Sequence, residues 1–217
     1  MISTREFIHP AALSSAFEDA TEILVPKGRW QEDYLGLLKL AGVDILWLDD
    51  IGGVAHDYVN KHNLRVTIQR DEAIPWCVDN IEGVVGFGCH HHYEAYRYNH
   101  PDTNIHYRPL GHVEGARFAL AAHRGRVDAT KQIWQDGGVI VIGTENEGMA
   151  HTLFSSRQFK PICQALPPGS VELGGRALAG LDAVLLIKQW GATSDHHQLE
   201  VFEDDLSPIF HNFYWRE

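Results

Sequence analysis

Short apolar runs alternate with amphipathic segments along most of the chain. The runs are typical of buried strands and lie at residues 22–25, 45–48, 64–68, 84–88, 116–122, 139–142 and 183–187. Apolar residues at spacings of three and four predict a helix over residues 30–41, which Gly42 closes. Shorter helices are predicted at residues 11–19, 74–80 and 147–156, the second with Pro75 in its first turn.

This alternation predicts an α/β protein with parallel sheets that are covered on both faces. The length of 217 residues and the 44% hydrophobic content are enough for a sizeable core, in one domain or in two small lobes. Ligands of such sheets bind beyond the carboxyl ends of the strands. The glycine-bearing loops of this chain fall at those ends, so the binding site is expected there.

Composition and charge narrow the possible partners. The formal net charge of −11 would repel a phosphate backbone and argues against nucleic acid, although a local basic pocket can still bind a small phosphorylated ligand. No apolar run approaches the ~18 residues of a membrane span, and residues 1–6 do not resemble a signal peptide. The three widely spaced cysteines fit a reduced, cytoplasmic setting.

The segment after the first predicted strand has the chemistry of an anion site. Pro26 is followed by Lys27, Gly28 and Arg29, and then by the predicted helix. A helix N-terminus presents free N–H groups and the positive end of its dipole, and Gly28 lets the backbone approach a ligand closely. Lys27 and Arg29 add charge and donors suited to a diphosphate. The alternative interpretation is that both are solvated turn residues.

A second loop and two arginines allow the same two interpretations. The loop at residues 191–194 (Gly191, Ala192, Thr193 and Ser194) either wraps a phosphate with amides and hydroxyls or is an ordinary turn with capping hydroxyls. Arg70 follows a predicted strand and Arg117 opens one. Each therefore either faces a ligand or lies exposed or paired.

The order and spacing of these segments resemble ATP phosphoribosyltransferase, the first enzyme of histidine biosynthesis, along nearly the whole chain. Residues 26–29 match the family's Pro-Lys-Gly-Arg, and Arg70 with residues 74–75 matches its Arg-x-x-Asp-Ile-Pro. Residues 169–172, which end in Glu172, match Gly-Ser-Val-Glu. Gly191 and Thr193 match the final Ser/Thr-Gly-x-Thr phosphate loop.

The resemblance implies a two-lobed α/β fold of the type II periplasmic-binding-protein kind, with a cleft between the lobes. Lobe I is expected at residues 1–112 and 200–217, and lobe II at residues 113–199. A chain that ends soon after the phosphate loop resembles the short form of the family. That form works as an oligomer with a separate regulatory subunit that resembles a histidyl-tRNA synthetase.

The implied activity is Mg²⁺-dependent transfer of phosphoribosyl from phosphoribosyl pyrophosphate to an aromatic nitrogen, which belongs to ATP in the family. Lys27 and Arg29 would hold the diphosphate, and residues 191–194 would hold the 5′-phosphate. Arg70 and Arg117 would contact the acceptor, and Glu172 is also expected among the substrate-binding residues.

Several ligand-facing positions depart from the family. Leu186 stands where the family has an Asp that contacts the ribose hydroxyls or the metal. Gln189 and Trp190 replace the Ser/Thr pair, and Trp190 would crowd the phosphate pocket or stack on a flat ligand. Because the core pattern survives, the changes are typical of a paralogue with altered chemistry.

Histidines are prominent among the replacements and support two other functions. His90, His91 and His92 fall in one predicted loop, and His196 and His197 fall beside another. Imidazoles from both loops would bind Zn²⁺ or Fe²⁺, although on a strand only His90 and His92 share a face. A histidine here would also suit general base catalysis. The alternatives to phosphoribosyl transfer are thus a metal-dependent enzyme and a non-catalytic binding or regulatory module. The simplest interpretation is that these histidines are surface residues without a function.

Overall fold

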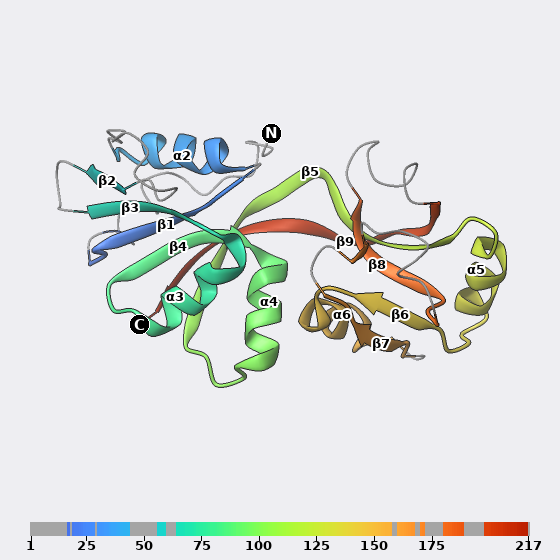
Figure 1. Ribbon diagram of the computed structural model, residues 1–217. Helices are drawn as coiled ribbons and strands as arrows, with labels where there is room; N and C mark the ends of the chain where they lie inside the picture. Colours follow the sequence, from blue (N-terminus) through green and yellow to red (C-terminus); the bar gives the residue numbers. More distant parts are fainter. Residues whose placement is uncertain are drawn as a thin grey trace. The chain divides into compact units, whose positions relative to one another are not determined.

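The computed structural model describes residues 17, 19–28, 30–43, 56–59, 64–157, 160–167, 170–171, 180–188 and 198–216. The chain divides into two compact units (Figure 1): unit 1 is residues 1–114 with 210–217, and unit 2 is residues 115–209. Strands β5 (Ile105–His123) and β9 (Leu199–Arg216) contribute residues to both units. The backbone therefore passes from one unit to the other twice, along these two strands.

Unit 1 is built on three parallel strands: β1 (Glu22–Pro26), β3 (Leu64–Gln69) and β4 (Val84–Cys89). Strand β2 (His56–Val59) pairs antiparallel with β3, and the last part of β9 pairs antiparallel with β4. The helical elements are α2 (Gln31–Leu40), the 3₁₀ turn η2 (Asp71–Ala73), α3 (Ile74–Asn80) and α4 (His90–Asn99).

Strands β1 and β4 of unit 1 are buried on both faces, which explains their continuous apolar runs. Side chains alternate across a strand, so Ile23 and Val25 of β1 pack in one cluster with Tyr34 and Leu38 of α2. Leu24, between them, packs in another cluster with residues of α3 and α4. The face of α2 that the apolar spacing predicts is confirmed, and Gly42, with φ +82°, ends the helix as expected.

Unit 2 contains strands that pair with β5 and with one another. Strand β8 (Ala183–Lys188) pairs antiparallel with β5 and parallel with β6 (Val141–Thr144), and β7 (Ile162–Ala165) pairs parallel with β6. The helices are α5 (Val127–Gln135) and α6 (Glu147–Phe154). The α/β class is thus confirmed. The expected cleft remains a prediction.

Most predicted elements appear, with three corrections. Residues 90–92 open a helix instead of lying in a loop, and the strand predicted at residues 116–122 begins at Ile105. The strand predicted at residues 139–142 lies two residues later. Helix α5 and strands β7 and β9 were not predicted. Most side chains of α5 and β7 are exposed and form no clear apolar run, and in β9 polar residues interrupt the apolar ones. The strand predicted at 45–48, and most of the helix predicted at 11–19, lie outside the described residues.

In the part of the chain that the structure describes, no helix combines the length and the apolar character needed to cross a bilayer. The three cysteines are all free thiols.

One polar contact ties helix α2 to strand β9 inside the core of unit 1. The hydroxyl of Tyr34 on α2 hydrogen-bonds Nδ1 of His211 on β9, and both residues are fully buried. The edge of the Trp30 ring meets the His211 ring, with 5.0 Å between centroids. Burial lowers the pKa of His211 to about 4. The imidazole is therefore neutral at neutral pH, and its protonation would destabilise the fold.

This gives a prediction for pH. The unfolded chain takes up a proton on His211 near pH 6.5 and the folded chain only near pH 4, so stability falls as pH drops through this window. The contribution of His211 is on the order of 3 kcal/mol. We expect the unfolding free energy of His211→Gln, measured in urea from pH 7 to pH 4, to fall less steeply than that of the wild type. Equal slopes would contradict the buried neutral imidazole.

A pair of glycines tests the packing of unit 1. A Cβ at Gly86 in β4 would lie 2.6 Å from Cγ2 of Ile74 and 3.3 Å from Cβ of Leu24, so Gly86→Ala should cost about 1–3 kcal/mol. A Cβ at Gly36 in α2 meets nothing within 4 Å, so Gly36→Ala should stabilise by about 0.5–1 kcal/mol. Urea midpoints measure both; shifts in the same direction would refute this description of the packing.

Candidate functional site

Three loops of unit 1 meet at one edge of its sheet because β1, β3 and β4 run parallel. Pro26 is the register partner of Gln69, and the amide of Lys27 donates to the carbonyl of Gln69 at 2.6 Å. The loop after β4 begins beside them. We call the resulting set of residues the carboxyl edge: Lys27, Gly28, Arg70, Asp71, His90, His91 and His92.

The turn from β1 into α2 has the features expected of an anion site. Lys27, Gly28 and Arg70 are exposed. Gly28 has φ +119°, a conformation that other residues rarely adopt, and its carbonyl accepts from the amide of Gln31 as the helix begins. No side chain caps the N-terminus of α2. Glu32 and Asp33 in the first turn carry the opposite charge, so a bound anion would have to compete with them.

Asp71 lies beside this turn and is held on two sides. The amide of Cys89 donates to Oδ1 of Asp71 at 3.1 Å, and Nε2 of His92 lies 3.9 Å from Oδ2. A Cβ at Gly88 would come within 2.8 Å of Oδ1, so the carboxylate occupies space that only glycine leaves open. Burial raises the pKa of Asp71, and the neighbouring His92 acts against this rise.

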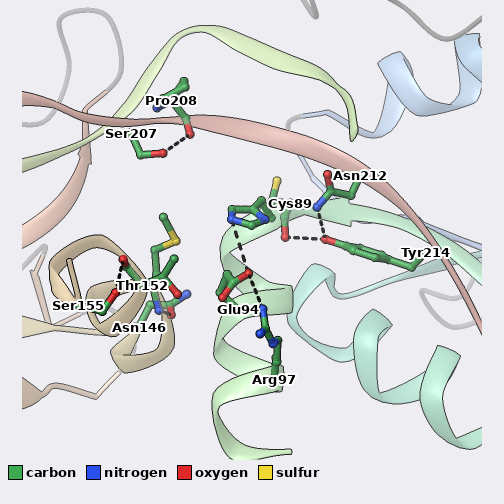
Figure 2. Close-up of polar contacts among 12 residues, drawn as sticks. Cys89, Glu94, Arg97, Asn146, Thr152, Ser155, Ser207, Pro208, Asn212 and Tyr214 are labelled. Atoms are coloured by element: carbon green, nitrogen blue, oxygen red, sulfur yellow. Dashed lines mark hydrogen bonds and ion pairs between the residues drawn. The ribbon is translucent and has the colours of Figure 1, made fainter. Parts of the chain in front are cut away.

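Cys89 and His211 have the residue types of a nucleophile and its base, with 3.9 Å between Sγ and Nδ1. The thiol is fully buried, and burial, followed by the Asp71 carboxylate, raises the pKa of Cys89 well above its usual range. A buried thiol that stays protonated is not a nucleophile. The backbone of Cys89 instead supports packing: its carbonyl accepts from the Tyr214 hydroxyl at 3.0 Å, and Asn212 donates to that hydroxyl at 3.4 Å (Figure 2).

The histidines of the edge point in different directions. Nε2 of His90 lies 3.8 Å from Oε1 of Glu94. The same oxygen lies 3.9 Å from Nη1 of Arg97 (Figure 2). His92 faces Asp71 instead. Because residues two apart on a helix lie about 200° apart, His90 and His92 do not share the face that a strand would give them. Burial lowers the pKa of His90, and it lowers the pKa of His91 well below the usual range.

The metal hypothesis draws no support from this arrangement. Among the residues that the structure describes, no three His, Cys, Asp or Glu side chains are grouped so as to hold a metal ion. The other two candidate ligands, His196 and His197, lie outside the described residues. A metal site shared by the two histidine clusters stays a prediction.

In unit 2, the described candidates have structural partners. Nη1 of Arg117 on β5 lies 3.7 Å from Oδ1 of Asp205. Leu186 on β8 is 7% exposed and packs in the core with Ala119. Besides these candidates, the side chain of Asn146 accepts from the amide of Met149 and so caps α6. The remaining candidates lie outside the described residues: Arg29, Glu172, Trp190, Gly191, Ala192, Thr193 and Ser194.

Sequence reasoning missed Asp71, Tyr34 and His211. Asp71 directly follows Arg70, and this position was the only feature of the sequence that could have indicated a functional role for it. Tyr34 and His211 are separated by 177 residues, and only the pairing of β4 with β9 brings them together.

A cavity of about 810 Å³ lies at the opposite end of the strands of unit 1. Its lining comes from the start of β1, the turn before β4 and the end of β9, and includes Thr21, Gly83 and Trp215. It is therefore separate from the carboxyl edge.

No family model matches the chain, and no curated protein matches it. Solved structures do. The complex of ATP phosphoribosyl transferase (HisG:HisZ) from Thermotoga maritima matches with a TM-score of 0.60 and 20% identity, over 90% of this chain and 87% of that chain. The periplasmic VFT2 domain of Bordetella pertussis BvgS matches with a TM-score of 0.52 and 12% identity, over 97% and 86%. The periplasmic aliphatic sulphonate binding protein SsuA from Escherichia coli matches with a TM-score of 0.51 and 11% identity, over 89% of this chain and 61% of that chain.

These likenesses extend over most of the chain but at very low identity. They establish a fold shared with a phosphoribosyl transferase and with periplasmic binding proteins, so the predicted type II periplasmic-binding-protein fold is confirmed. Fold alone does not decide between transfer and binding.

Proposed function

We propose that this protein binds phosphoribosyl pyrophosphate at the carboxyl edge of unit 1 and transfers its phosphoribosyl group to an aromatic nitrogen. The observation that carries the proposal is the turn of Lys27 and Gly28 at the start of α2, one hydrogen bond away from the end of β3, which leads into Arg70. Two exposed cations and an uncapped helix N-terminus at one edge suit a diphosphate group. The fold shared with the Thermotoga maritima transferase supports the same assignment.

Transfer at the anomeric carbon requires that the leaving diphosphate be neutralised and the acceptor be held in line. Lys27 and Arg29 would bind the diphosphate, Arg70 would orient the acceptor, and residues 191–194 would hold the 5′-phosphate. Mg²⁺ is bound mostly by phosphate oxygens and water, with one or two carboxylates. Glu32 and Asp33 in the first turn of α2 would supply such carboxylates. Without Mg²⁺ their charge opposes anion binding, and with Mg²⁺ bound the same charge would help to hold the metal. Mg²⁺ would neutralise the leaving group.

The Thermotoga maritima structure is a complex of two different proteins. Association with a regulatory subunit, in a homo-oligomer in the cytoplasm, is therefore part of the proposal. The three free cysteines are compatible with a reducing compartment.

A second candidate is a binding module without catalysis. Leu186 favours it, because the position where the transferase family has an Asp is here part of the core of unit 2. An apolar side chain that packs against Ala119 cannot hold ribose hydroxyls or a metal. The sulphonate-binding protein from Escherichia coli is a binding protein with the same fold.

Thermal denaturation of the metal-stripped protein tests ligand binding directly. Phosphoribosyl pyrophosphate with Mg²⁺, at a hundred times its dissociation constant, should stabilise the fold by about 2.7 kcal/mol and raise Tm. We expect Lys27→Ala/Arg29→Ala to abolish this rise, because the diphosphate loses both cations.

The matched control is Lys39→Ala/Lys131→Ala, which removes two exposed positive charges that do not belong to the carboxyl edge and should keep the rise. Release of diphosphate on adding ATP or another heteroaromatic acceptor separates the two candidates: binding with release supports transfer, and binding without release supports the module. The absence of any Tm shift at millimolar ligand would refute both uses of this edge.

A further inference from the structure

In the contact between Asp71 and His92, a carboxylate faces one nitrogen of an imidazole and can orient its ring. Oδ2 of Asp71 lies 3.9 Å from Nε2 of His92, about 1 Å beyond a hydrogen bond. The Asp71 side chain is 13% exposed and that of His92 is 27% exposed, so the carboxylate is shielded while the imidazole can reach a ligand. Such contacts often tighten only when a substrate is bound.

The position of the carboxylate is fixed by its surroundings. The Cys89 amide occupies Oδ1, and the space beside Oδ1 exists because residue 88 has no side chain. Oδ2 is left to face His92. A carboxylate that accepts from Nε2–H keeps the proton on that nitrogen, which leaves Nδ1 with a free lone pair.

The geometry favours His92 over its neighbours on α4. His91 is buried. His90 faces Glu94 of the same helix, and Glu94 also pairs with Arg97. The His90 ring lies near the rings of Tyr107 and Phe210. His92 alone of the three is paired with a residue adjacent to Arg70, and the strand before Arg70 is hydrogen-bonded to Lys27.

We propose that His92 is the general base for the acceptor and that Asp71 is the residue that positions it. This inference rests on the proposed function. The acceptor nitrogen forms a bond to the anomeric carbon as the bond from that carbon to the diphosphate oxygen breaks, and the electron pair leaves with diphosphate. The proton that the acceptor loses goes to Nδ1 of His92, and Asp71 stabilises the imidazolium. Asp71 is not among the residues that carry the family resemblance, and neither is His92.

Kinetics of diphosphate release test the role of His92. We expect His92→Ala to lower kcat by about 10²–10⁴ while the Tm shift with phosphoribosyl pyrophosphate and Mg²⁺ is unchanged. Free imidazole should restore part of the rate, because it supplies the missing base. His90→Ala is the matched control: it removes the other carboxylate-paired imidazole of this turn and should not respond to imidazole. Equal losses in both variants, or no rescue of His92→Ala, would overturn the proposal.

A second measurement does not depend on any ligand. The ¹⁵N NMR shifts of His92 should show the Nε2–H tautomer in the wild type and a mixture of tautomers in Asp71→Asn. Asn keeps an oxygen for the Cys89 amide, so this variant should fold. An unchanged tautomer would refute the Asp71–His92 pair even if the transferase activity is real. If the wild type neither binds phosphoribosyl pyrophosphate nor releases diphosphate, the proposed function fails and the base assignment falls with it, while the tautomer still decides whether the pair exists.

Discussion

The parallel pairing of β1, β3 and β4 is the constraint on which the candidate site depends. Parallel strands have their carboxyl ends at one edge, so the loops that follow them must meet there. The register of Pro26 with Gln69 brings Lys27 next to Arg70 and Asp71. Strand β4 leads into the first turn of α4 at the same edge. The antiparallel pairing of β4 with β9 then adds His211 from the far end of the chain. Residues from four separate segments share this region because of strand direction alone.

Burial decides which of these groups is reactive. Cys89 and His211 lie close together, but both are fully buried, and desolvation keeps the thiol protonated and the imidazole neutral. They therefore hold β4, β9 and α2 together. Lys27 and Arg70 remain exposed and available to a ligand. Asp71 lies between these extremes, since it is largely buried and held by an amide, yet still faces an accessible imidazole. A gradient of exposure across a few residues thus separates the structural polar groups from the candidate catalytic ones.

The two units differ in how far their described residues fit the transferase pattern that the sequence resembles. Unit 1 has the turn of Lys27 and Gly28 with its left-handed glycine. In unit 2, Leu186 faces the core, Arg117 pairs with Asp205, and the N-terminus of α6 is capped by its own Asn146. Leu186 and Asn146 are used by the fold itself, while the pair of Arg117 and Asp205 is exposed on the surface. Among the described residues, the candidate chemistry therefore gathers at the carboxyl edge of unit 1.

The amino-acid sequence by itself determined the α/β class, most of the strands and the tight turn at Lys27 and Gly28 before α2. These follow from local rules: apolar runs form buried strands, Gly42 ends a helix, and Gly28 allows a positive φ. It did not reveal that His90 begins a helix, because the histidine- and tyrosine-rich stretch has no clear apolar face and only the packing of Tyr93 against Tyr214 gives it one. It also could not join Asp71 to His92 or Tyr34 to His211, which depend on strand order and register between distant segments. Those contacts, and the protonation that burial imposes on them, were decided by the tertiary structure, since desolvation and distance exist only once the chain has folded.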